Sequence, residues 1–106
     1  MEHTLVFKWG VSRGRDTYGY SICSLYVNGK KVAMCNGGGY DMQGTVFGNW
    51  IASKFKDELL KLEIPMIDGA CGFSSVKTTI EALGYKLEYI HNNSKESIYV
   101  LKPIDN

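Results

Sequence analysis

Alternating apolar and polar residues in the first third of the chain predict three β-strands. Within 4–11 every second residue is large and apolar, the pattern of a strand with one buried face. Aromatic and β-branched residues dominate 18–27, which predicts a second strand. Asn28-Gly29 follows, the sequence most typical of a two-residue type I′ turn. Residues 30–36 are therefore predicted to return as a third strand.

The two-residue turn also predicts how the second and third strands pair. With Val27 opposite Lys30, the register places Cys23 opposite Met34 on an apolar face. Cys35 then falls on the face opposite to that of Cys23. We therefore expect no disulfide between these two cysteines.

Two later stretches have the spacing of amphipathic helices. Within 45–62 large apolar residues recur every four positions, and Pro65 ends this helix. Ser74 or Ser75 is expected to cap a second helix, which Gly84 terminates.

Two more strand patterns, 85–91 and 97–103, lie on either side of the polar stretch HNNSKE. The element order is therefore βββ-αα-ββ. We predict an α+β fold in which two helices pack on one face of a mostly antiparallel sheet. With 106 residues, the chain is expected to form a single domain.

Composition narrows the possible functions. Apolar residues make up 44% and charged residues 22% of the chain, as in an ordinary globular protein. The net charge of +1 argues against binding to duplex DNA. No apolar run approaches the ~20 residues of a membrane span, and we expect no membrane partner. Three cysteines without paired metal-ligand spacing predict free thiols and a cytoplasmic location.

The most distinctive stretch is CNGGGYDMQGT, residues 35–45, which joins a predicted strand to a predicted helix. The hairpin register places it beside SRGRDT, residues 12–17, at one rim of the sheet. Consecutive glycines can direct several N–H groups at one anion, arginine can clamp a phosphate, and tyrosine can stack on a base. We therefore predict a rim, formed by loops 12–18 and 36–45, that binds an anion or a nucleotide. Its candidate ligand-binding residues are Arg13, Arg15, Asp16, Thr17, Tyr18, Asn36, Gly37, Gly38, Gly39, Tyr40 and Asp41.

Structural roles explain the same residues. The glycines can form a bulge where the chain leaves the sheet, and the arginines can pair with Asp16 and Asp41. The glycine spacing fits neither the P-loop nor the G-x-G-x-x-G pattern. We expect no catalytic residue and no cofactor. Mg²⁺ is expected only together with a phosphorylated ligand, held by Asp16 and Asp41.

Tyrosines mark a second candidate surface. Tyr20 and Tyr26 are predicted on the sheet face opposite Cys23, and Tyr85, Tyr89 and Tyr99 lie in the later strands. If helices cover one face, exposed tyrosines on the other could form a homodimer interface or bind a partner protein.

The segment SRGRDTYGYSICSLYVNGKKVAMCNGGGYDMQGT, residues 12–45, resembles small, largely uncharacterised proteins encoded by bacteriophages. The resemblance implies a short protein that acts in the cytoplasm of the host bacterium. It also implies an inhibitor of host defence, which sequesters a nucleotide signal or binds a defence protein.

Taken together, the residues and the resemblance predict a non-catalytic protein that binds a phosphorylated small molecule at the rim. An alternative is an inhibitor that docks on a host protein through its exposed tyrosines. A third hypothesis is a small enzyme that acts on a phosphate ester with Asp16 or Asp41. Local binding of single-stranded nucleic acid is a fourth.

Overall fold

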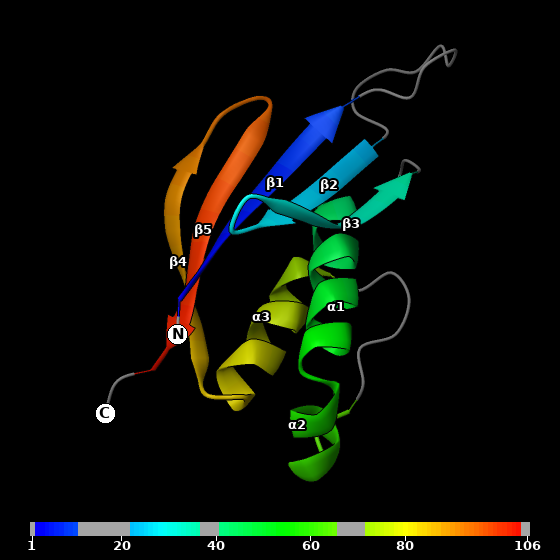
Figure 1. Cartoon of the computed structure of the whole chain (residues 1–106), viewed down its shortest axis with the longest axis vertical. Coiled ribbons are helices and arrows are strands. Elements are labelled where there is room, and N and C mark those ends of the chain that lie inside the picture. Colours follow the sequence, from blue (N-terminus) through cyan, green and yellow to red (C-terminus); the bar gives the residue numbers. More distant parts are fainter. Residues whose placement is uncertain (1, 11–21, 37–40, 66–71, 105–106) are drawn as a thin grey trace.

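A five-stranded antiparallel sheet and one layer of helices make up the fold (Figure 1). The computed structural model describes residues 2–10, 22–36, 41–65 and 72–104. The strands follow the order β3-β2-β1-β5-β4 in the sheet. The elements are β1 (His3–Gly10), β2 (Ile22–Val27), β3 (Lys30–Asn36), α1 (Met42–Lys54), α2 (Lys56–Lys61), α3 (Phe73–Ala82), β4 (Tyr85–Asn92) and β5 (Glu96–Pro103). The predicted α+β fold is confirmed, and the early and late strands share one sheet.

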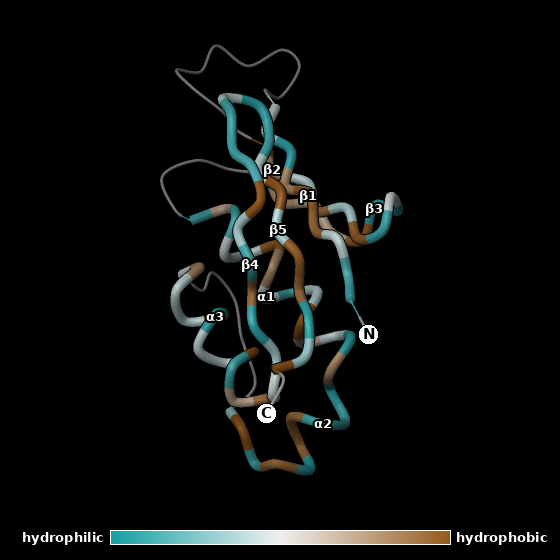
Figure 2. The backbone as a smooth tube through the Cα atoms, turned by 90° about the vertical axis from the view of Figure 1, so that its left-hand side faces the viewer, coloured by the Kyte–Doolittle hydropathy of each residue, from teal (hydrophilic) through white to brown (hydrophobic). Residues whose placement is uncertain are grey.

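Strand β1 is central because both hairpins pair with it, β2 on one side and β5 on the other. The predicted alternation along β1 is confirmed. Leu5 and Phe7 are completely buried beneath the helices, whereas Thr4 and Lys8 on the other face are exposed. Figure 2 shows hydrophobic positions along β1, β2 and β5, at the centre of the molecule.

The core is organised around the ring of Phe7. Phe47 of α1, Phe73 of α3 and Tyr99 of β5 approach it edge-on, with ring centroids 5.9, 6.0 and 5.9 Å away. Such edge-to-face pairs add about 0.5–1.5 kcal/mol beyond the burial of their surface. One aromatic cluster therefore joins the centre of the sheet to both long helices.

The hairpin turn forms as predicted. Asn28 and Gly29 both have positive φ, 52° and 85°, as a type I′ turn requires. Asn28 also contacts β1. Its backbone N–H donates to the carbonyl of Thr4, and its Oδ1 accepts from the N–H of Thr4, both at 2.9 Å. The turn thereby extends the β1–β2 ladder.

The predicted register of β2 and β3 is correct at the turn and wrong beyond it. The register shifts between Leu25 and Tyr26, and Val32 is the extra residue on β3. As a result Cys23 pairs with Cys35 rather than Met34, so the two cysteines share a face. A β-bulge of this kind shifts every later pair by one residue. Neither of these two cysteines forms a disulfide.

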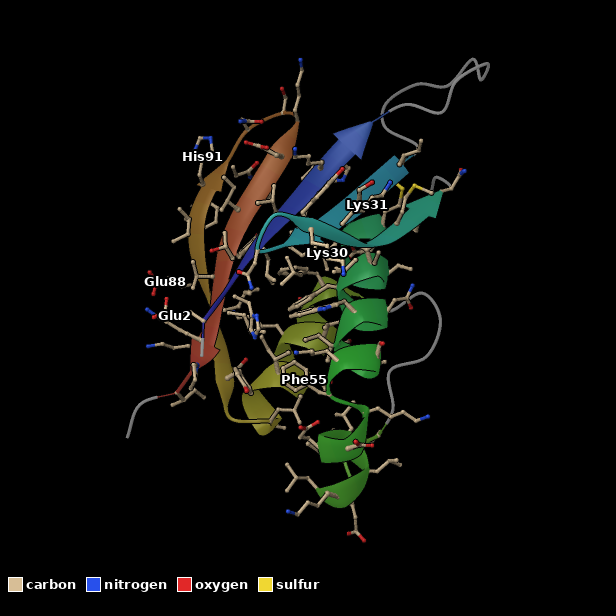
Figure 3. The ribbon with its side chains drawn as sticks, in the orientation of Figure 1. Glu2, Lys30, Lys31, Phe55, Glu88 and His91 are labelled. Carbon is tan, nitrogen blue, oxygen red and sulfur yellow. The ribbon has the colours of Figure 1, made fainter. Side chains whose placement is uncertain are left out.

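A second bulge lies on β4, where Ile90 is the extra residue between Tyr89 and His91. Both bulges thus fall on the edge strands, β3 and β4. These edges also carry charged and polar side chains, among them Lys30 and Lys31 on β3 and Glu88 on β4 (Figure 3). Bulges and charges are devices that keep an edge strand from pairing with another chain.

The helices begin earlier than predicted. The helical stretch starts at Met42, and it is divided at Phe55 into α1 and α2. The inward residues of this stretch are buried as predicted, namely Phe47, Ile51, Phe55 and Leu59. Leu62, three residues after Leu59, is 54% exposed.

The predicted N-cap of the next helix, Ser74 or Ser75, is wrong. Helix α3 begins at Phe73 with Gly72 as its N-cap, so Ser74 and Ser75 lie within the first turn. Both serines are exposed. Gly84, with φ 91°, follows the helix as predicted.

Helix α2 ends in a Schellman motif with an unusual residue. The N–H of Ile64 donates to the carbonyl of Leu59 and the N–H of Glu63 to that of Leu60, at 2.9 and 3.2 Å. Glu63 has φ 57°, in the left-handed region that glycine usually occupies at this position. The side chain of Glu63 therefore adds backbone strain.

Replacing Glu63→Gly should stabilise the protein by about 0.5–1 kcal/mol, since the strain of a left-handed residue exceeds the entropic cost of glycine. The free energy of unfolding in urea measures the effect. Leu62→Gly is the matched control, because Leu62 is also exposed but has φ −89°. This control should lose stability. If Glu63→Gly and Leu62→Gly changed the free energy of unfolding equally, the backbone of Glu63 would not be strained.

Candidate functional site

One end of the sheet brings together segments that are distant in sequence (Figure 1). At this end β1 and β3 finish, α1 begins, and the β4–β5 turn meets the end of β1. A backbone hydrogen bond of 2.9 Å from the N–H of Trp9 to the carbonyl of Lys95 joins the turn to β1. This end of the sheet is the rim at which the sequence predicts a ligand-binding site.

Part of the predicted rim belongs to the described residues. Asn36 is the last residue of β3 and is exposed, and Asp41 precedes α1. The remaining candidates lie outside the described residues, so their roles and the contact between loops 12–18 and 36–45 stay predictions. They are Arg13, Arg15, Asp16, Thr17, Tyr18, Gly37, Gly38, Gly39 and Tyr40.

Asp41 caps two helices at once. Its Oδ1 accepts the N–H of Gly44 in the first turn of α1 at 2.9 Å, as an N-cap does. Its Oδ2 accepts the N–H of Phe73, the first residue of α3, at 2.8 Å. A carboxylate also interacts favourably with the positive end of each helix dipole. Sequence reasoning considered Asp41 as a ligand-binding residue and missed this structural role.

Replacing Asp41→Ala should cost about 1–3 kcal/mol of stability, because two helix N-termini lose their acceptor. Asp41→Asn should lose less, since its single amide oxygen can still cap one of them. Urea denaturation of the two variants and of Asp57→Ala, an exposed acid in the first turn of α2, tests this. If Asp41→Asn were as stable as wild type, the second carboxylate oxygen would contribute nothing to the free energy of unfolding.

A cavity of about 300 Å³ opens beside this capped corner of the rim. We call it the rim pocket. Its lining residues come from the end of β1, the first turn of α1 and the β4–β5 hairpin. They are Trp9, Gln43, Asn92, Asn93, Ser94 and Ser97. The volume lies at the lower end of the range of small-molecule sites, about 300–1,000 Å³.

The hairpin side of the rim pocket is held in place by Asn93. Its Oδ1 accepts the N–H groups of Lys95 and Glu96 at 2.8 and 3.0 Å. Its Nδ2 lies 3.3 Å from Nε2 of His91. An asparagine that binds the backbone two residues on is a turn-forming motif. Asn93 therefore shapes the pocket wall.

Gln43 lines the rim pocket with an unpaired group. Its Nε2 atom is buried and, among the residues that the structure describes, has no hydrogen-bond partner. An unsatisfied buried donor costs about 1–3 kcal/mol. If the amide turns toward the pocket, an occupant that accepts a hydrogen bond removes this cost.

Sequence reasoning did not find the rim pocket. Trp9 belongs to the apolar alternation that predicts the first strand, and HNNSKE is the polar stretch between the last two predicted strands. The run of amide and hydroxyl groups in HNNSKE was the available signal. That signal becomes informative once the sheet order places β5 next to β1.

The paired cysteines lie between the sheet and the start of α1. Cys23 is completely buried. Burial, with smaller contributions from Cys35 and Asp41, raises the pKa of the Cys23 thiol to about 12. Cys35 is half-buried, and its Sγ lies 3.6 Å from the carbonyl oxygen of Met42. A thiol that stays protonated at neutral pH is a poor nucleophile, so we interpret Cys23 as a core residue.

Alkylation with iodoacetamide at pH 8 should therefore leave Cys23 unmodified in the folded protein, while half-buried Cys35 reacts. Peptide mapping by mass spectrometry gives the extent of modification at each cysteine. Protein unfolded in urea, in which both thiols are accessible, is the control. Native labelling of Cys23 at the rate of Cys35 would contradict its burial and raised pKa.

No cluster of three or more His, Cys, Asp or Glu side chains within the described residues could hold a metal ion. None of the described helices is long and apolar enough to cross a membrane.

Comparisons of the chain with protein-family models, with curated proteins and with solved structures find no match.

Proposed function

We propose that the protein is a non-catalytic binding protein that holds a nucleotide at the rim. The observation that supports it is the rim pocket, an open pocket lined by an aromatic ring and by amide and hydroxyl groups. Binding sites for small ligands combine an aromatic or apolar wall with a few polar groups that fix orientation.

The phosphate of such a ligand needs donors other than the two helix N-termini. Asp41 already accepts the N–H groups of Gly44 and Phe73. We propose that Arg13, Arg15 and the glycines 37–39 supply these donors, because arginine and consecutive backbone N–H groups bind phosphate well. Mg²⁺ would accompany the phosphate if Asp16 contributes a ligand.

The resemblance of residues 12–45 to bacteriophage proteins suggests the biological setting of this proposal. A small protein with one nucleotide site and no catalytic step would act by sequestration. It would lower the free concentration of a nucleotide signal in the host cytoplasm, and thereby inhibit a defence system that depends on this signal.

A second candidate function is binding to a host protein or to another copy through the open face of the sheet. On this face Val6, Ile98 and Val100 are half-buried and adjacent in the β1–β5 register. Tyr26 lies there as predicted, with Nζ of Lys8 4.8 Å from its ring centroid. Tyr89 and Tyr99 lie on the other face of the sheet. Tyr89 pairs with Tyr99 and Tyr99 pairs with Leu5, whose side chain is on the helix-covered face.

The nucleotide proposal is tested first on freshly purified protein. Mass spectrometry of material released by heating should detect a nucleotide. If a nucleotide that was bound is released chemically unchanged, the protein does not turn it over. In a thermal-shift screen of mono-, di- and cyclic nucleotides, a ligand at a hundred times its Kd adds about 2.7 kcal/mol of stability.

Arg15→Ala should reduce the affinity for the nucleotide at least tenfold without changing the melting temperature of the ligand-free protein. Lys31→Ala is the matched control, since it removes the same charge from β3 near the hairpin turn, at the end of the strand away from the rim. Absence of binding by every nucleotide would refute the proposed function. In that case a dimer or a host-protein complex that Tyr26→Ala disrupts would support the second candidate.

A further inference from the structure

The residues that line the rim pocket share one chemical property, which is the absence of charge. One indole, three side-chain amides and two hydroxyls form the wall, and none of them is ionisable at neutral pH. A phosphate group is bound by cations or by several converging N–H donors. The described wall of this pocket is therefore suited to the uncharged part of a ligand.

Trp9 provides a flat surface in a fixed position. It belongs to the central strand, where its backbone pairs with Cys23 of β2 and donates to Lys95 of the hairpin. The side chain is half-buried, and it packs against the core. A ring held in this way can stack on any heteroaromatic base at low entropic cost, and stacking of this kind is worth about a factor of ten in affinity.

Gln43 provides the directional contact. It lies in the first turn of α1, one residue before Gly44, which Asp41 caps. Its buried Nε2 has no acceptor within the described part of the chain. Ring nitrogens and carbonyl groups on the edge of a nucleobase are acceptors, and a side-chain amide can pair with such an edge in a bidentate manner.

We infer that the rim pocket binds the base of the nucleotide, with Trp9 stacking on its face and the side-chain amide of Gln43 turning toward the pocket to donate from Nε2 to an acceptor on its edge. This inference rests on the proposed function, and it assigns the choice of ligand to two residues that take no part in phosphate binding. The phosphate then lies outside the rim pocket. A nucleoside should therefore bind, whereas ribose 5-phosphate should gain nothing from this pocket.

The test measures affinities of wild type, Gln43→Met and Trp9→Phe for the four common nucleosides, their 5′-nucleotides and ribose 5-phosphate. Methionine matches the length of glutamine and cannot donate. Gln43→Met should weaken binding of the preferred nucleoside and its nucleotide about tenfold. The same variant should melt no lower than wild type without ligand, because it removes an unsatisfied buried donor. Asn49→Met, an exposed polar residue on the same helix, is the control.

Fluorescence gives a second readout, since the chain contains two tryptophans, Trp9 and Trp50. Trp50 is buried in the core, 8% exposed. Stacking of a base should quench the emission of Trp9, and the quench should disappear in Trp9→Phe while much of the affinity persists on the phenyl ring. Trp9→Phe also keeps an aromatic residue at a position that packs against the core.

The outcomes separate the two proposals. If no nucleotide or nucleoside binds, both the proposed function and this inference are wrong. If nucleotides bind wild type and Gln43→Met equally, and binding leaves the fluorescence of Trp9 unchanged, the inference alone is overturned and the base lies elsewhere. Loss of affinity in Gln43→Met together with an undiminished melting temperature supports the assignment of the rim pocket to the base.

Discussion

The carboxylate of Asp41 joins the starts of the two long helices. Each of its oxygens accepts an N–H from the first turn of a different helix, α1 through Gly44 and α3 through Phe73. Phe73 links this cap to the core, because its ring packs against Phe7 and Tyr99. One side chain thus holds the first turns of the two helices together, and Gln43, in the same turn of α1, lines the rim pocket. The start of α3 is therefore held by a hydrogen bond to Asp41 and by the packing of the Phe73 ring in the core.

Much of this architecture could be predicted from local sequence. The alternation in β1, the turn at Asn28 and the four-residue spacing of α1 each depend on residues that are close in the chain, and the structure confirms them. The register of β2 and β3 beyond the turn could not be predicted, since the bulge at Val32 depends on how a whole strand fits its neighbour. The capping of α3 was missed for a related reason, because the acceptor comes from a residue 32 positions away.

The same distinction applies to the candidate site. The glycines and arginines of the loops could be selected from the sequence, because these residue types are typical of phosphate binding. The rim pocket was not foreseen, since its members are ordinary strand, helix and turn residues that the sheet order brings together. Trp9 has a half-buried place in the regular pattern of β1, and nothing in that pattern distinguishes a core ring from one that also borders a cavity. A site assembled from three distant segments becomes visible once the topology is known.

The central place of β1 has a consequence for how the molecule is made. Its pairs with β5 join residues near the start of the chain to residues near position 100, for example Leu5 with Tyr99. During synthesis on the ribosome, β1, β2 and β3 can form a hairpin sheet early, but one edge of β1 stays unpaired until β5 emerges. The cluster around Phe7 also lacks Tyr99 until then. The complete sheet therefore cannot form before β5 has been synthesised, and a nascent chain halted before β5 presents an open strand edge to chaperones and proteases.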